Sequence, residues 1–123
     1  MEEAQLLNEI KRLEDIYMNP QEFKQYKNYW LPESIVKEST NVLSLGVHRD
    51  VGWEQEMLKD NPNLNIHLYD PTPDTVKMWE SNFPGKDKMT FHQVAYNKTP
   101  GTMKFYYDKT DLSKCYSLLP LPQ

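Results

Sequence analysis

NVLSLGVHRDVGWEQEMLKDNPNLNIHLYDPTP, residues 41–73, predicts a strand, a glycine turn, a helix and a second strand, in that order. The first strand is a short apolar run with a β-branched member, as buried parallel strands show, and consists of Val42, Leu43 and Leu45. Gly46 ends this run, and residues 53–59 then suit a helix that the turn around Pro62 breaks. This order of elements predicts an α/β fold built on a parallel sheet.

The second strand pattern covers residues 65–69 and ends in an acid, Asp70, because the prolines that follow cannot continue a ladder. In a doubly wound sheet, ligands bind outside the carboxyl ends of the strands, and an acid about 20 residues after the glycine turn suits ribose hydroxyls. Asp70 follows Gly46 by 24 residues. Between Gly46 and Gly52 there is no middle glycine through which a pyrophosphate could approach, so the pattern favours a nucleoside-type ligand over a dinucleotide.

Three segments of the chain resemble the FkbM-type and related S-adenosylmethionine-dependent methyltransferases. Some members carry a loop G-V-G-x-D-[IV]-[SG]-[FW]-[ED] and then a D-P-T-P turn, and here residues 46–54 read GVHRDVGWE and residues 70–73 read DPTP. The downstream element G-T-x-K-F-Y is present as GTMKFY at residues 101–106. The chain departs from the pattern at His48, where many members have a small residue, and at Ser44, where many methyltransferases place an acid.

This resemblance implies a Rossmann-like, class I methyltransferase fold, which is a three-layer α/β sandwich with S-adenosylmethionine as its cofactor. The residues that would line the cofactor loop are Gly46, Val47, His48, Asp50 and Gly52. Asp70 would accept hydrogen bonds from the ribose hydroxyls, and Pro71 and Thr72 would shape the adenosine side. In the family the enzyme moves a methyl group to an oxygen or another nucleophile of a small molecule or sugar, but the residues here name neither the acceptor nor a catalytic base.

The same residues also have structural interpretations. The glycines could be ordinary turn glycines, and Asp70 could cap the following helix, a role that is compatible with ribose binding. Asp50 either caps the helix after the glycine turn or contacts the methionine end of the cofactor. His48 has no metal-type partner near it in sequence, so no metal site is predicted. Cys115 is the single cysteine and lacks an obvious base partner, which argues against a catalytic thiol.

Residues 1–40 are expected to form amino-terminal helices before a partial methyltransferase domain of residues 41–123, in one structural unit. Apolar residues recur at helical spacing over residues 2–18. Residues 21–39 are expected to continue as helix, with a break at residues 31–32. An aromatic stripe in this segment is expected to pack against the sheet, or alternatively to form a lid over the ligand mouth, and comprises Phe23, Tyr26, Tyr29 and Trp30.

The carboxy-terminal part is expected to add a helix and a β-hairpin. Thr72 can cap a helix that begins at Pro73 and has an apolar side, and residues 84–85 end it. Residues 89–96 and 102–107 are two strand patterns separated by a five-residue turn, which predicts a hairpin. The expected fold class is therefore a truncated Rossmann-like α/β sandwich with amino-terminal helices and a carboxy-terminal β-hairpin.

The resemblance covers the first three strands of a larger sheet plus the hairpin, so the strand of residues 42–45 should have an open edge. The tail of residues 112–121, a second copy in a homodimer, or a second polypeptide that completes the sheet could cover this edge. Because the acceptor-positioning half is missing, activity stays undecided. The alternatives are a truncated, non-catalytic binding or interaction module that dimerises, and a non-functional remnant.

Composition narrows the expected partners. The formal net charge of −4 comes without a basic cluster, so nucleic acid is not expected as a partner. No run approaches the ~18 apolar residues of a membrane span, and the acidic amino terminus lacks the apolar core of a signal peptide. A cytoplasmic protein with neither a membrane nor a nucleic-acid partner is expected.

Overall fold

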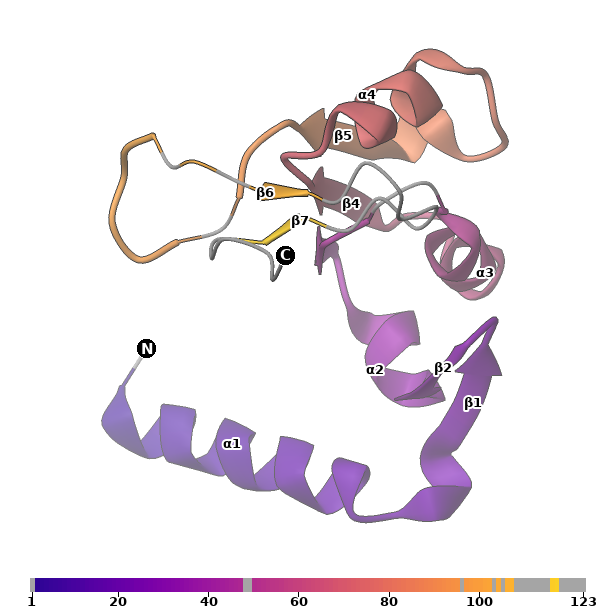
Figure 1. Cartoon of the computed structure of the whole chain (residues 1–123). Helices are drawn as coiled ribbons and strands as arrows, with labels where there is room; N and C mark the ends of the chain where they lie inside the picture. The colour runs from indigo at the N-terminus through magenta and orange to yellow at the C-terminus, as the bar shows by residue number, and fades with distance from the viewer. Residues whose placement is uncertain are drawn as a thin grey trace.

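The computed structural model describes residues 2–47, 50–95, 97–102, 104, 106–107 and 116–117, which form a mixed α/β structure (Figure 1). The elements in chain order are α1 (Glu3–Tyr17), the 3-10 turn η1 (Pro20–Glu22), β1 (Phe23–Tyr26), β2 (Tyr29–Pro32), α2 (Glu33–Glu38), β3 (Asn41–Leu45), α3 (Gly52–Asp60), β4 (Asn65–Tyr69), α4 (Pro73–Glu80), the 3-10 turn η2 (Lys86–Lys88), β5 (Met89–His92), β6 (Tyr106–Tyr107) and β7 (Tyr116–Ser117).

A parallel sheet in the order β3-β4-β5 forms the centre of the fold and confirms the predicted strand-helix-strand unit. The three strands are in register through Ser44, Leu68 and Phe91, whose side chains therefore share one face. On this face Ser44 bonds to Glu54 of α3, and Phe91 stacks on Trp79 of α4. Both connecting helices thus lie on the same side of the sheet, as sequential parallel strands with right-handed crossovers require.

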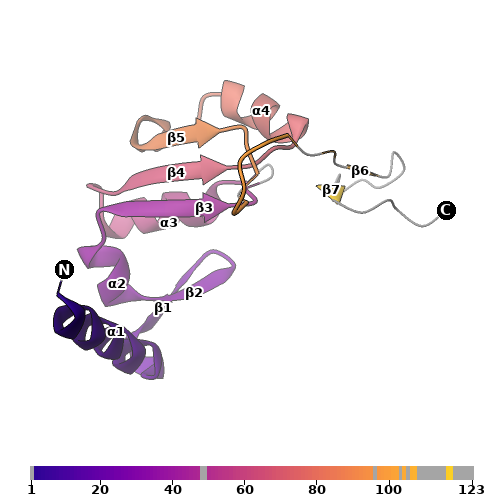
Figure 2. The same cartoon turned by 90° about the vertical axis from the view of Figure 1, so that its left-hand side faces the viewer.

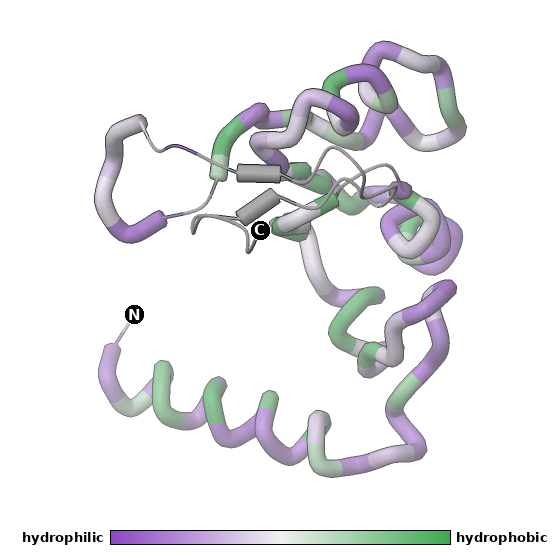
Figure 3. Tube along the Cα trace, viewed as in Figure 1, coloured by the Kyte–Doolittle hydropathy of each residue, from purple (hydrophilic) through white to green (hydrophobic). Residues whose placement is uncertain are grey.

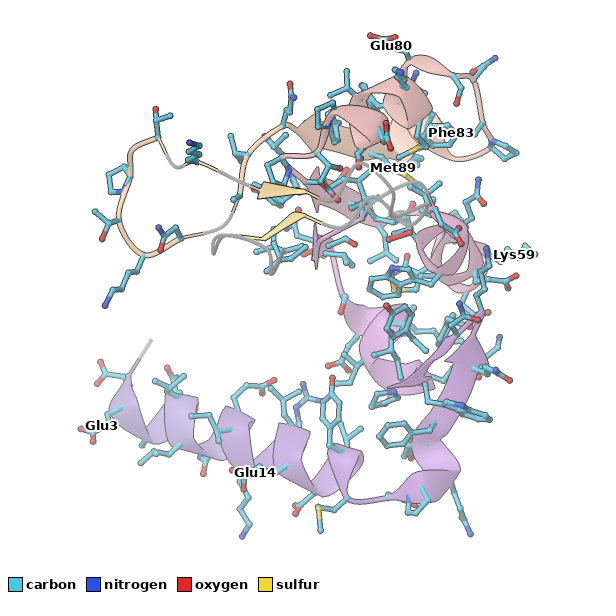
Figure 4. The ribbon with its side chains drawn as sticks, in the orientation of Figure 1. Glu3, Glu14, Lys59, Glu80, Phe83 and Met89 are labelled. Atoms are coloured by element: carbon cyan, nitrogen blue, oxygen red, sulfur yellow. The ribbon has the colours of Figure 1, made fainter. Side chains whose placement is uncertain are left out.

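The hydrophobic core lies between this face and the helices. Its buried members are Tyr26, Val36, Val47, Val51, Met57, Leu64, Ile66, Leu68 and Met89. Complete burial of an aliphatic side chain contributes about 1.5–3 kcal/mol to folding, so the fully buried Leu64, Ile66 and Leu68 contribute most through β4 and the turn before it. Lys59 and Glu80 project from the outer sides of α3 and α4, away from the sheet (Figure 4). The helices are therefore amphipathic layers over a single core.

The opposite face of the sheet is largely open, and Figure 2 looks onto it with α3 behind the strands. Leu43 and Leu45 of β3 lie on this face and are 61% and 53% exposed. In the described part of the chain β3 pairs with β4 alone, so the open edge expected from the sequence is present. The third layer expected for a sandwich corresponds to none of the described elements, and the tail of residues 112–121 lies outside the described residues.

The helix predicted for residues 21–39 is wrong over its first half. Residues 23–26 and 29–32 form an antiparallel hairpin, β1-β2, and only α2 is helical. Tyr26 is the one buried member of the aromatic stripe, and its hydroxyl donates to Asp60 of α3 at 2.7 Å. Of the stripe, Tyr26 joins the core beneath the sheet, beside α3, while Trp30 is 60% exposed.

Helix α1 is present as predicted, but none of its residues is buried. Arg12 Nη2 forms an ion pair with Glu38 of α2 at 2.6 Å, and Tyr17 packs edge-to-face on Phe23. Figure 3 shows apolar residues recurring along one side of this helix. The helix is therefore tied to α2 and β1 while its apolar side stays accessible.

The hairpin predicted from residues 89–96 and 102–107 is wrong in its pairing. Strand β5 ends at His92 and pairs in parallel with β4, whereas β6 pairs antiparallel with β7. Strand β5 pairs with the edge of β4 because pairing there buries Met89, which a separate hairpin would leave exposed. Local turn residues at 97–101 therefore do not determine the partner of β5.

Asn61 joins α2 to the turn before β4 through one buried amide. Its Nδ2 donates to the backbone carbonyls of Val36, Lys37 and Ser39 at 2.9–3.2 Å, and its Oδ1 accepts from Asn63 N at 3.1 Å. We expect Asn61→Ala to lower the free energy of unfolding by about 2 kcal/mol, because buried carbonyls lose their donor. Urea denaturation measures the loss. Asn63→Ala, at an exposed neighbour, is the matched control, and equal stability of the two variants would contradict the expectation.

Candidate functional site

A pocket of about 400 Å³ opens at the carboxyl end of β3. Its floor comes from the end of β3 and the loop into α3, where Gly46, Val47 and Asp50 of the predicted cofactor loop line it. Its other wall comes from the β1-β2 turn, with Lys27, Asn28 and Tyr29. The pocket therefore lies where a parallel sheet places its ligands, outside the carboxyl ends of the strands.

Gly46 makes the turn that opens this pocket. Its φ is +73°, in the left-handed region that favours glycine, and its N–H donates to the carbonyl of Tyr69 at 2.9 Å. This bond holds the ends of β3 and β4 together. A ligand that contacts the glycine turn would thus lie within reach of the residues that follow β4.

We expect Gly46→Ala to destabilise the fold by about 1 kcal/mol through backbone strain alone, since a Cβ at this position would meet no atom within 4 Å. Thermal unfolding measures the effect. Gly101→Ala, also at a positive φ in open space but outside the glycine turn after β3, is the control for strain elsewhere in the chain. A variant with parental stability would show that the turn relaxes.

Asp50 caps α3 and forms an ion pair with the hairpin turn. Its Oδ1 accepts from the N–H of Gly52 at 2.7 Å, and its Oδ2 lies 2.7 Å from Lys27 Nζ. The hydrogen bond from Lys27, followed by that from Gly52, lowers the pKa of Asp50. The capping role left open by the sequence is therefore present, and it coexists with a position on the pocket wall.

Lys27 lies over the loop between β3 and α3, where its ammonium group pairs with Asp50. Its own backbone is left-handed, with φ +57°. A Cβ on Gly52 would come within 2.5 Å of Lys27 Nζ, so glycine at this position is what allows the ammonium group to approach. Gly52 and Lys27 also border a second hollow of about 580 Å³, on the outer side of α3. Lys27 therefore separates two surface hollows.

An aromatic pair forms one side of the 400 Å³ pocket. Tyr29 and Trp53 have ring centroids 5.2 Å apart at 51°, and both line the pocket. Tyr29 is 56% exposed, so one of its faces is available to a ligand. Of the aromatic stripe, Tyr29 is the residue that lines this pocket, which it reaches from the hairpin turn.

Asp70 is buried and forms the turn that leads into α4. One carboxylate oxygen, Oδ1, accepts from the N–H of Thr72 at 2.8 Å and from its hydroxyl at 2.7 Å. Thr72 in turn shares a 2.7 Å hydrogen bond with Thr75, and all three side chains are buried. Thr72 occupies the N-cap position of α4, so Asp70 holds the turn before the helix, directly beyond the end of β4, and does not take the capping role that the sequence left open.

The structure divides the predicted cofactor residues among several places. Gly46, Val47 and Asp50 share the 400 Å³ pocket, whereas Gly52 lies in the neighbouring hollow. Pro71 borders a separate pocket of about 520 Å³ with residues 93–95, 97 and 99–102. His48 lies outside the described residues. The hydrogen bond between Gly46 and Tyr69 nevertheless brings the glycine turn and Asp70 close together, because it joins the ends of β3 and β4.

Glu54 is a buried carboxyl that the residue patterns did not single out. It is 0% exposed, accepts from Ser44 Oγ at 2.9 Å through Oε1, and its Oε2 has no hydrogen-bond partner in the described part of the chain. Burial raises the pKa of Glu54 to about 7. Helical spacing was the available signal, because Glu54 precedes the buried Met57 by three residues. It lies beneath the sheet, beside the pocket residue Ser44.

Metal ligands do not gather at this site. Within the described residues, no three His, Cys, Asp or Glu side chains are arranged to hold a metal ion, and His67 Nδ1 and His92 Nε2 form a pair at 3.3 Å. None of the described helices has the length and apolar character needed to cross a membrane. Comparison with protein-family models, with curated proteins and with solved structures gives no match.

Proposed function

We propose that this chain binds a nucleoside-type cofactor, S-adenosylmethionine, at the carboxyl ends of β3 and β4, as a methyltransferase-like protein with a Rossmann-like sheet. The observation that carries the proposal is the junction of the two strands. The left-handed turn at Gly46 is hydrogen-bonded to the carbonyl of Tyr69, directly before Asp70. A glycine turn and an acid are thereby held at neighbouring strand ends, which is the arrangement used for nucleoside ligands in doubly wound sheets.

Each part of the cofactor has a corresponding part of the site. The ribose hydroxyls would donate to Asp70, which lies directly beyond the end of β4 and beside the glycine turn. Pro71 and Thr72 would border the adenosine side. The methionine end would lie toward Gly46, Val47 and Asp50, within the 400 Å³ pocket.

We propose binding for this chain, and methyl transfer only if an acceptor surface is supplied. Transfer requires the nucleophile, the methyl group and the sulfur to be held in line. Glu54 is buried below the pocket and does not line it. Asp50, the carboxylate among the described residues that line the pocket, is already engaged by Lys27 and Gly52, so acceptor positioning would have to come from elsewhere.

A second candidate function is a non-catalytic interaction module. The observation in its favour is the open edge of β3, which carries the exposed Leu43 and Leu45 and contains neither a charged residue nor a proline. Edges of this kind are templates for pairing unless they are covered. The two functions differ in what they need: the first needs a cofactor, and the second needs a protein partner.

Calorimetric titration of the purified chain with S-adenosylmethionine and S-adenosylhomocysteine tests the first function. We expect saturable binding with a micromolar Kd, about −8 kcal/mol. NAD is the control ligand, because the loop lacks the glycine that admits a pyrophosphate. No heat at millimolar S-adenosylmethionine, or equal affinity for NAD, would overturn the assignment.

A further inference from the structure

The open face of the parallel sheet is an uncovered apolar and aromatic surface. By strand alternation it carries Leu43 and Leu45 of β3, His67 and Tyr69 of β4, and His92 of β5. The His92 ring stacks on Tyr69 at 4.5 Å and lies 5.5 Å from His67, so three rings form a continuous row. Parallel sheets are normally covered on both faces. None of the described elements supplies the layer that would cover this side.

Helix α1 has an apolar stripe that no other part of the described structure covers. In α1 the residues Leu6, Ile10, Leu13 and Tyr17 follow the spacing 4, 3, 4 along one side. Leu6, Ile10 and Tyr17 are 48%, 43% and 49% exposed. A helix with an unburied apolar stripe requires a packing partner to hold it in water. The fold thus contains an uncovered sheet face and an uncovered helix stripe.

We propose that two copies of this chain associate by exchanging these surfaces, with α1 of each copy lying on the open sheet face of the other. The dimensions agree, because 15 residues of helix extend ~22 Å while five-residue strands extend ~17 Å. The strands contribute no carboxylate to this face, and α1 is acidic through Glu3, Glu9 and Glu14. A two-fold axis repeats the contact, so both copies lose their exposed stripes together.

A second copy fits better than the chain's own helix. Within one copy, α1 is fixed beside α2 by Arg12, which pairs with Glu38, and by the packing of Tyr17 on Phe23. In this arrangement Ile10 and Leu43 both stay exposed, so the two apolar surfaces do not cover each other. Exchange between copies covers both surfaces without breaking the contacts that fix α1. This inference specifies the surface of the interaction-module candidate and is independent of cofactor binding.

Sedimentation equilibrium of the full chain, without cofactor, tests the exchange. We expect a dimer whose Kd rises at least tenfold in Ile10→Glu and in Leu43→Lys. Asn8→Glu, on the opposite side of α1, is the matched control and should leave the Kd unchanged. Circular dichroism establishes that each variant is folded, since all three positions are exposed in one copy.

Mixing the two variants is the decisive measurement. In a mixed dimer one contact joins two unaltered surfaces, and the other joins the new glutamate to the new lysine. An equimolar mixture should therefore form dimers at a protein concentration at which each variant alone is monomeric. Recovery would support the exchange, because a misfolded variant could not be rescued. A monomeric parent, a dimer unaffected by Ile10→Glu, or a mixture that stays monomeric would each overturn it, the second result pointing to pairing through the β3 edge.

Discussion

The stability of this protein should fall by about 3 kcal/mol as the pH rises from 4.5 to 7, and Glu54→Gln should remove most of that fall. Burial raises the pKa of Glu54 from 4.5 to about 7 in the folded state. Between these values the folded state keeps the proton while the unfolded state releases it. Stability therefore decreases as the pH rises and levels off above the folded pKa, at 1.36 kcal/mol per pH unit within the window.

Glutamine preserves the shape of the Glu54 side chain and an oxygen to accept the Ser44 hydrogen bond. It has no carboxyl to ionise, so the pH-dependent loss disappears. Urea denaturation at several pH values measures the free energy of unfolding, and Glu56→Gln is the control because Glu56 lies on the same helix with a 43% exposed side chain. A parent without a slope, or a slope that survives Glu54→Gln, would place the titrating group elsewhere.

Asp70→Ala should weaken the binding of S-adenosylmethionine about 30-fold, or about 2 kcal/mol, if the ribose hydroxyls donate to this carboxylate. The same change also removes the acceptor for the N–H and hydroxyl of the buried Thr72, so the turn before α4 is weakened and stability falls by about 1–2 kcal/mol. Calorimetry must therefore be done below the unfolding temperature of the variant.

Thr75→Val separates these two effects of Asp70. It removes the hydrogen bond between Thr72 and Thr75 and weakens the start of α4, but it leaves the Asp70 carboxylate in place. We expect it to lose stability while keeping the cofactor affinity of the parent. A folded Asp70→Ala variant that binds as tightly as the parent would mean that Asp70 serves only to hold the turn before α4.

Much of the fold was predictable because its central unit is encoded locally. The strands β3 and β4 and the helices α1 and α3 agree with the sequence patterns, since each has a continuous apolar periodicity. The β1-β2 hairpin was not predictable in this way. Aromatic residues at positions 23, 26 and 29–30 imitate helical spacing, whereas burial of Tyr26 depends on Asp60, 34 residues further along the chain. Contacts of this range leave no periodic signal.

The residues of the candidate site also divide into those whose place could be predicted from the sequence and those whose place could not. Gly46, Val47 and Asp50 follow a strand, so their place at its end could be predicted. Lys27 and Tyr29 could not, because they reach the pocket through a hairpin that the sequence patterns assigned to a helix. Glu54 was missed because glutamate on a helix normally faces water, and its burial here depends on Ser44 and the packing of α3.

At Lys27, the substitutions that would raise thermostability would also remove a positive charge from the pocket mouth. Its left-handed backbone favours glycine or asparagine, so a screen for heat resistance should select Lys27→Gly or Lys27→Asn, with a gain of ~0.5–1 kcal/mol. Either replacement would also discard the ammonium group that pairs with Asp50 and separates the two hollows. The stabilised variant would then have a wider and more acidic pocket mouth, and hence a different selectivity for charged ligands.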